Sequence, residues 1–81
     1  MVTPEQCRAA RAWLGWTQAQ LAERASVGIS TIKDFEGKSR TPIQNNHSAI
    51  QRTLEEAGLQ FLFDAKDKAV GVALDSYKPK K

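Results

Sequence analysis

The chain has 81 residues, 41% of them hydrophobic, which is enough for one domain with a modest core but too little for a catalytic domain with a deep cleft. The formal net charge of +3 is weak evidence for a nucleic-acid partner, because Lys78, Lys80 and Lys81 alone account for it. No apolar run approaches the length of a membrane span, and Glu5 and Arg8 interrupt any signal-peptide pattern, so we expect a cytoplasmic protein without a membrane partner.

The first predicted helix runs from Pro4 to Leu14. Thr3 and Gln6 form a capping box at its start, and Gly15 can end it. Trp13 lies off the inner stripe of this helix, and we expect it to pack on the core rather than in a dimer contact.

The inner stripe of this helix contains a charged residue. Cys7, Ala10 and Leu14 form the stripe, but Arg11 lies on the same side. An isolated buried charge would cost several kcal/mol. Glu36, a negative charge on the inner side of a later helix, would carry the same cost if it were buried alone. We therefore predict that Arg11 and Glu36 pair; the alternative is that both side chains reach solvent and the pair adds little.

Two short helices joined by a tight turn are predicted over residues 17–37, TQAQLAERASVGISTIKDFEG. Thr17 and Gln20 make a second capping box, so the first of these helices begins there. Either Ser26 or Gly28 supplies the break before the second helix. Two helices with so short a link must cross steeply, which is the geometry of a helix-turn-helix.

The second of these helices, Ile29 to Gly37, has two different faces. Ile32, Phe35 and Glu36 lie on the inner face, whereas the outer face is small and polar and suits hydrogen bonding to base edges in a major groove. A plain solvated face is the alternative, and whether Ile29 touches a thymine methyl or the core stays open. The polar residues of the outer face and its flanks are Ser30, Thr31, Lys33 and Asp34.

The segment after Gly37, KSRTPIQNN, is a predicted loop, because Pro42 precludes continuation of the helix. Lys38 and Arg40 are placed to contact phosphates beside the groove, although a solvated loop with two ordinary surface charges is the alternative. The asparagines offer a cap for a fourth helix that ends at Ala57.

Metal and catalytic chemistry have no candidate site in the sequence. The single cysteine, Cys7, excludes an internal disulfide, and with His47 it is too sparse for a zinc or redox site. We expect Cys7 in the core and His47 partly exposed. No nucleophile with a base, carboxylate pair or phosphate-cradling glycine loop appears at workable spacing, so we predict no enzyme, no cofactor and no metal.

One run of residues follows the pattern T-Q-x-x-L-A-x-x-A-x-V-x-x-x-T-I-x-x-x-E, namely Thr17, Gln18, Leu21, Ala22, Ala25, Val27, Thr31, Ile32 and Glu36. This run resembles the Cro and phage-repressor type of helix-turn-helix, the XRE family, over roughly Cys7 to Leu59. The resemblance implies a lambda-repressor-like DNA-binding domain, the pair Arg11 and Glu36, and phosphate contacts at Thr17 and Gln18. The residues that the resemblance places against DNA bases or the DNA backbone are Ile29, Ser30, Thr31, Lys33 and Asp34.

From Leu59 the pattern changes to short runs rich in β-formers, LQFLF and AVGVAL, separated by a loop from Asp64 to Lys68. Residues 59–75 are a predicted C-terminal β-hairpin, and residues 76–81 a flexible basic tail. A lone hairpin is marginal in water and leaves edges open, so we infer that the hairpins of two chains pair or pack in a homodimer. The alternative is a hairpin folded wholly onto its own helices. The predicted dimer contacts are Phe61, Leu62, Phe63, Val70 and Val72.

The sequence thus predicts a mainly α protein, with a four-helix lambda-repressor-like helix-turn-helix domain over residues 1–58 followed by the hairpin. We expect it to regulate transcription by binding double-stranded DNA. A dimer would place two copies of the Ile29 to Gly37 helix in successive major grooves, about 34 Å apart, on an inverted repeat. Two other hypotheses stay open: the antitoxin of a toxin and antitoxin pair, which would bind a toxin through the hairpin or tail, and a module that binds only proteins.

Overall fold

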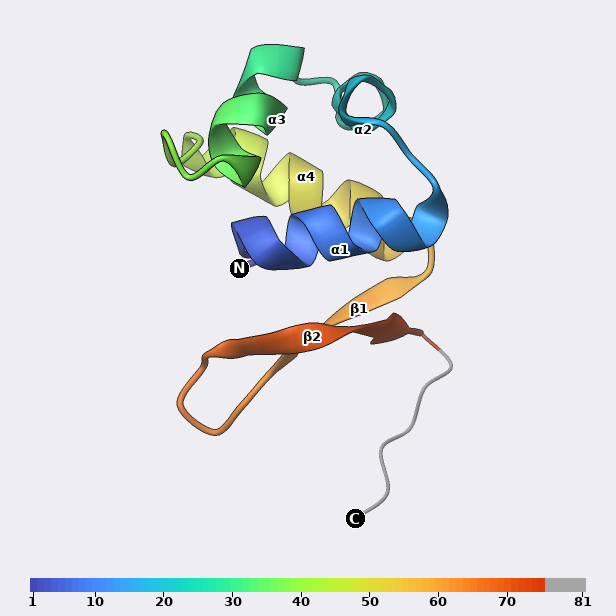
Figure 1. Cartoon of the computed structure of the whole chain (residues 1–81), viewed down its shortest axis with the longest axis vertical. Coiled ribbons are helices and arrows are strands. Elements are labelled where there is room, and N and C mark those ends of the chain that lie inside the picture. The colour runs from blue at the N-terminus through green and yellow to red at the C-terminus, as the bar shows by residue number, and fades with distance from the viewer. Residues whose placement is uncertain (76–81) are drawn as a thin grey trace.

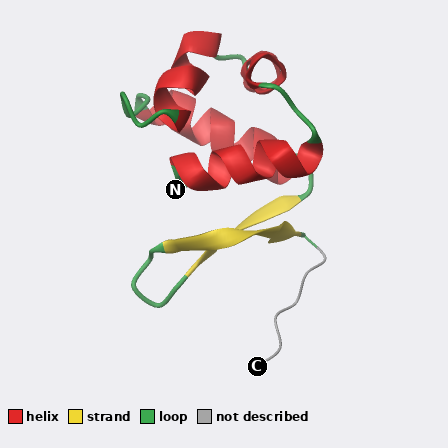
Figure 2. Ribbon diagram, viewed as in Figure 1, coloured by secondary structure: helices red, strands yellow, loops and turns green. Residues whose placement is uncertain are grey.

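Four helices and a two-stranded antiparallel hairpin make up residues 1–75, the part of the chain that the computed structural model describes (Figure 1). Figure 2 shows that these residues are mainly helical, as the sequence predicts, and the predicted tail 76–81 lies outside them. The longest of these helices has 13 residues, and none of them is long and apolar enough to cross a bilayer. The elements are α1 (Pro4–Leu14), α2 (Gln18–Ala25), α3 (Ile29–Glu36), α4 (Gln44–Glu56), β1 (Leu59–Phe63) and β2 (Ala69–Leu74).

Capping boxes begin α1 and α2, as predicted. The hydroxyl of Thr3 accepts a bond from the Gln6 N–H at 3.2 Å, and the Gln6 side chain accepts one from the Thr3 N–H at 3.0 Å. Thr17 and Gln20 repeat this arrangement at 3.0 and 2.8 Å. Each box satisfies two N–H groups that a helix start otherwise leaves without partners.

The turn between α2 and α3 breaks at Ser26, which has a left-handed φ of 58° and caps the end of α2. Gly28 has an ordinary φ of −69° and precedes α3 as its N-cap. Of the two residues that the sequence left open, Ser26 therefore supplies the break. In Figure 1 α2 is seen end-on and α3 runs across the view, so the two helices cross steeply.

The prediction that asparagine caps α4 is wrong. Ile43 is the N-cap and makes no side-chain cap bond. The N–H of His47 donates to the Ile43 carbonyl at 2.9 Å, so the helical bonds already begin ahead of the asparagines. Asn45 and Asn46 lie inside the first turn of α4.

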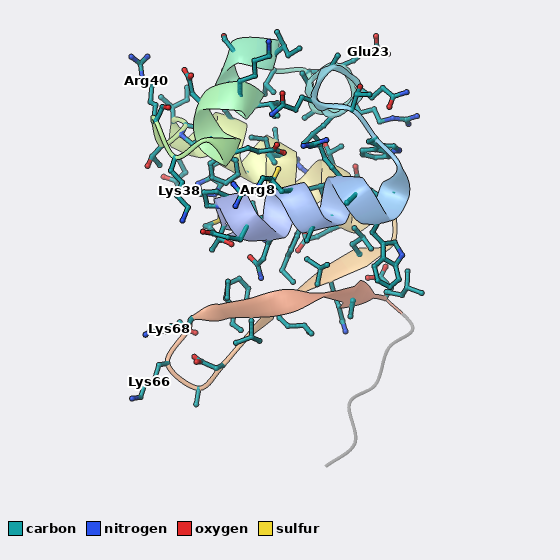
Figure 3. The ribbon with its side chains drawn as sticks, viewed as in Figure 1. Arg8, Glu23, Lys38, Arg40, Lys66 and Lys68 are labelled. Atoms are coloured by element: carbon teal, nitrogen blue, oxygen red, sulfur yellow. The ribbon has the colours of Figure 1, made fainter. Side chains whose placement is uncertain are left out.

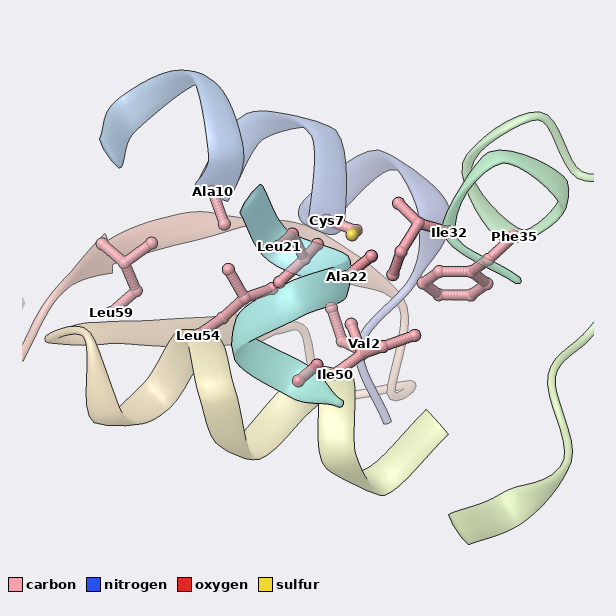
Figure 4. Packing of buried hydrophobic residues seen from close by; sticks show 11 residues of the cluster. Val2, Cys7, Ala10, Leu21, Ala22, Ile32, Phe35, Ile50, Leu54 and Leu59 are labelled. Atoms are coloured by element: carbon pink, nitrogen blue, oxygen red, sulfur yellow. The ribbon is translucent and has the colours of Figure 1, made fainter. Parts of the chain in front are cut away.

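One hydrophobic core joins all four helices to the start of β1 (Figure 4). The expected core position of Trp13 is wrong, since its side chain is 59% exposed. Trp13 follows the buried Cys7 by six residues, which places it about 120° away around the helix. The buried apolar residues are Val2, Cys7, Ala10, Leu21, Ala22, Ala25, Ile32, Phe35, Ile50, Leu54 and Leu59.

One face of the hairpin packs against α1 and α4. The Gln6 amide, on α1, donates to the carbonyls of Leu62 and Gly71, both at 3.1 Å, and so bonds to both strands. Phe61 and Val72 lie opposite each other in the register and pack against the core. Both side chains are half-buried there, so the chain's own helices cover them in part, and their role as dimer contacts stays a prediction.

The other predicted dimer residues remain accessible. Leu62 is half-buried, whereas Phe63 is 39% and Val70 62% exposed. The register pairs Leu62 with Gly71 and Phe63 with Ala69, so Val70 is the extra residue of a β-bulge.

Candidate nucleic-acid interface

α3 presents one face to the core and the other to solvent. Ile32 is fully buried and Phe35 and Glu36 are each 3% exposed. Figure 4 shows Ile32 and Phe35 among the core side chains. Ile29 is 43% exposed, so it belongs to the outer face and not to the core. The other exposed residues of this face are Ser30 and Lys33.

The outer face of α3 forms one wall of a shallow cleft, and the loop after α3 forms the other. Thr31 and Asp34 are half-buried in this cleft. The N–H groups of Ser39 and Arg40 donate to the Asp34 carbonyl at 2.9 and 3.3 Å, which folds the loop back along the helix. The cleft has a volume of about 240 Å³ and is lined by Ser30, Thr31, Asp34, Arg40, Thr41, Pro42, Ile43 and Asn46.

Four cleft residues were not expected at the site from the sequence, namely Thr41, Pro42, Ile43 and Asn46. They reach α3 because of the path of the loop, which depends on bonds to a carbonyl rather than on a side-chain pattern. Ile43 is 69% exposed, so an apolar side chain borders the polar face of α3.

The predicted pair of Arg11 and Glu36 is present, and it fixes the end of α3 against α1. The Arg11 Nε lies 2.7 Å from Glu36 Oε2 and its Nη2 lies 2.7 Å from Oε1, a bidentate geometry. The Nη1 of Arg11 also donates to the Trp16 carbonyl at 2.9 Å. One guanidinium therefore links three segments of the helical domain.

Two further side chains bind the Glu36 carboxylate. The Gln18 amide donates to Oε1 at 3.0 Å, and the Cys7 thiol donates to Oε2 at 3.1 Å. Burial acts against the charge of Glu36, but the hydrogen bonds from Arg11, Gln18 and Cys7 outweigh it and hold the pKa of Glu36 below its usual value. Burial, and then the bond to Glu36, raises the pKa of the Cys7 thiol, which remains a donor.

Arg8 is a member of this site that sequence reasoning missed. Its guanidinium donates to the backbone carbonyl of Glu36, at the last residue of α3. Figure 3 shows Arg8 on α1 near that end of α3. A cation at a helix C-terminus also interacts favourably with the helix dipole. The spacing in the sequence could have indicated this role, because Arg8 and Arg11 are three residues apart and therefore share a face of α1.

A scan against protein-family models and a search of curated proteins found no match for this chain. The interpretation of the site on α3 therefore rests on the geometry of this chain alone. Figure 1 shows α2 and α3 at one end of the long axis and the hairpin at the other. Within residues 1–75, no group of three or more His, Cys, Asp or Glu side chains could hold a metal ion.

The expected phosphate ligands have different surroundings. Thr17 is exposed at the start of α2, and its hydroxyl hydrogen remains able to donate. Gln18 already donates to Glu36, so a phosphate would compete with that bond. Lys38 contacts Glu5, but both side chains are more than half exposed and the pair is weak. Arg40 is exposed beside the cleft, where Figure 3 shows it at the edge of the molecule.

Proposed function

We propose that this chain is a sequence-specific DNA-binding regulator with a lambda-repressor-like helix-turn-helix of the XRE type, in which α3 enters the major groove. The contrast between the two faces of α3 carries the proposal: Ile32 is fully buried, whereas Ile29 is 43% exposed. A helix anchored by one face and bearing short polar side chains on the other can approach base edges closely.

The dimensions and chemistry of α3 support this role. An α-helix with its side chains is about 10–12 Å across, and the major groove is about 12 Å wide. Lys33 can donate to guanine O6 or N7, and Asp34 can accept from cytosine N4. The hydroxyl groups of Ser30 and Thr31 can donate to an acceptor or accept from a donor on a base edge. Ile29 can contact a thymine methyl.

Cationic and polar groups around α3 support phosphate binding. Arg40 and Lys38 follow the helix, and Thr17 and Gln18 open α2. Such contacts orient a protein on the duplex without reading its sequence. Each phosphate that a cation neutralises releases counterions, so binding should weaken steeply as salt is raised.

In this proposal two copies of the chain bind together. A dimer places its two α3 helices in successive major grooves, about 34 Å apart, and the preferred site is an inverted repeat.

The test is DNA binding by a double variant of α3, Thr31→Ala with Lys33→Ala. We expect this variant to lose its preference for a selected site over random DNA while its thermal unfolding stays close to wild type, because neither side chain belongs to the buried core. The matched control is Lys66→Ala, which removes the same charge at the hairpin loop labelled in Figure 3. Full preference in the double variant would contradict the role of α3, and failure of the wild type to bind any DNA at low salt would favour a protein-binding module.

A further inference from the structure

A second cleft, which we call the side pocket, adjoins the loop that follows α3. It has a volume of about 460 Å³ and is bordered by residues 1–5, the end of α3, the loop and His47 of α4. Arg40 and Thr41 line both this pocket and the cleft beside α3, so the loop separates the two. Small-molecule sites typically have volumes of about 300–1,000 Å³, so the side pocket is large enough for a small ligand.

Apolar side chains of the core form the floor of the side pocket. Val2 is 1% and Phe35 3% exposed. The His47 ring packs edge-on against Phe35, with ring centroids 5.0 Å apart, and its Nε2 donates to the Val2 carbonyl at 2.7 Å. The Val2 N–H donates to Gln51 Oε1 at 2.8 Å. The floor and the α4 wall are therefore held in place by bonds within the chain.

The rim of the side pocket carries cationic side chains. Figure 3 shows Lys38 and Arg40 on the same side of the molecule, and both line this pocket. Lys38 contacts the Glu5 carboxylate, but both side chains are more than half exposed, so another carboxylate can replace that of Glu5 at little cost. Arg40 pairs with no carboxylate within residues 1–75.

The backbone of Lys38 is strained. Its φ is 62°, in the left-handed region, whereas Gly37 beside it has an ordinary φ of −84°. Glycine adopts the left-handed conformation without a steric penalty, and a residue with a Cβ does not. Such strain is typical of ligand clamps and other functional sites. The strain at Lys38 therefore indicates a role for its ammonium group at the rim.

We propose that the side pocket binds a small organic carboxylate with an apolar body. The carboxylate lies between Lys38 and Arg40 in place of that of Glu5, and the body covers Val2 and Phe35. A guanidinium can bind a carboxylate through two parallel hydrogen bonds, which suits Arg40 to this role. Binding to the side pocket does not depend on DNA binding by α3.

Occupation of the side pocket should weaken DNA binding, a point that rests on the proposed function. Lys38 and Arg40 are the cations that the proposed function assigns to DNA phosphates beside α3. A ligand carboxylate bound to both would reduce the slope of log affinity against log salt by about 1.8, or 0.9 for each phosphate contact. By thermodynamic linkage, DNA should weaken ligand binding by the same factor as the ligand weakens DNA binding.

The test is a titration of the full chain without DNA, followed by the amide signals in NMR. Phenylacetate and octanoate are the probes. At least one of them should shift the amides of Val2, Phe35 and Thr41 saturably, with a Kd of about 1 mM or tighter. Phenylethanol and octanol have the same bodies without the charge, and acetate has the charge without the body. Each should bind at least about tenfold more weakly than the matching probe.

Two variants test the roles of the charges. Lys38→Gly removes the ammonium and the backbone strain, so it should bind the probes about tenfold more weakly yet unfold at the wild-type temperature or above. Glu5→Gln removes the competing carboxylate and should tighten binding about fivefold, the effect of one like charge at about 4 Å in water. Lys66→Ala and Glu23→Gln, labelled positions far from the pocket in Figure 3, are the matched controls and should bind as the wild type does.

The proposal fails if neither probe shifts these amides, or if the uncharged alcohols bind as tightly as the probes. Unchanged affinity in Lys38→Gly, or weaker binding in Glu5→Gln, would also overturn it. A chain that binds a probe but no DNA would keep this inference and contradict the proposed function. DNA affinity that does not change at a saturating probe concentration would keep the site and overturn its coupling to DNA.

Discussion

Replacing Arg11 with alanine should destabilise the domain, because Glu36 would keep its charge in a buried site. Glu36 is 3% exposed and accepts four side-chain hydrogen bonds, two of them from Arg11. Removing one partner of a fully buried ion pair costs about 3–5 kcal/mol. The Arg11 side chain is 19% exposed, so water can enter the vacated space and the expected cost is about 2–3 kcal/mol.

Thermal unfolding measured by circular dichroism tests this expectation. In a domain of this size each kcal/mol lowers Tm by about 4–8 °C, so Tm should fall by roughly 10–20 °C at neutral pH. Arg52→Ala is the matched control, since Arg52 is exposed on α4 and its loss should change Tm little. Equal Tm values for the wild type and the Arg11 variant would refute the structural role of the pair.

The pH dependence separates lost charge pairing from lost packing. In the wild type the pKa of Glu36 is below the ordinary 4.5, so its contribution to stability is present above that value and is lost as pH falls through the lowered pKa. Without Arg11, burial should instead raise the pKa of Glu36. The variant should then gain stability as pH falls from neutral toward the pKa of an ordinary carboxyl group. The gap in Tm should therefore narrow in acid, whereas a gap independent of pH would indicate packing alone.

Three further substitutions test other parts of the structure. Gln6→Leu removes the donor to two hairpin carbonyls, at a cost of about 1–2 kcal/mol, and also the acceptor of the α1 capping box. Amide hydrogen exchange should speed up in the hairpin and at the start of α1 more than in α2, and a uniform increase would contradict this local role. Ile29→Ala should change the free energy of unfolding by less than about 0.5 kcal/mol yet weaken DNA binding, and a larger loss of stability would return Ile29 to the core. Arg40→Ala should reduce the slope of log affinity against log salt by about 0.9, and an unchanged slope would remove Arg40 from the phosphate contacts.

The features that follow from local spacing could be predicted from the sequence. Thr3 and Gln6 form a capping box because residues three apart meet at a helix start. The pairing of Arg11 with Glu36 followed from the cost of burying either charge alone. Both predictions needed only helical periodicity and the energetics of buried charge.

The remaining features depend on how the elements meet in space. LQFLF carries apolar side chains on both faces, so the sequence could not show which face packs on the helices, and the packing of Phe61 against the core of its own chain became visible only in the structure. Trp13 lies on the flank of α1 beyond the core, where nothing in the described chain covers it fully. The cleft beside α3 forms because the loop bonds back to the Asp34 carbonyl, and no side-chain pattern reports such a bond.

Selection of bound sites from random double-stranded DNA tests the central claim most directly, that the outer face of α3 reads base sequence. The wild-type chain should enrich one motif with two-fold symmetry, and the Thr31→Ala, Lys33→Ala variant should enrich none under the same conditions. No enrichment by the wild type at low salt, or the same motif selected by both proteins, would contradict it.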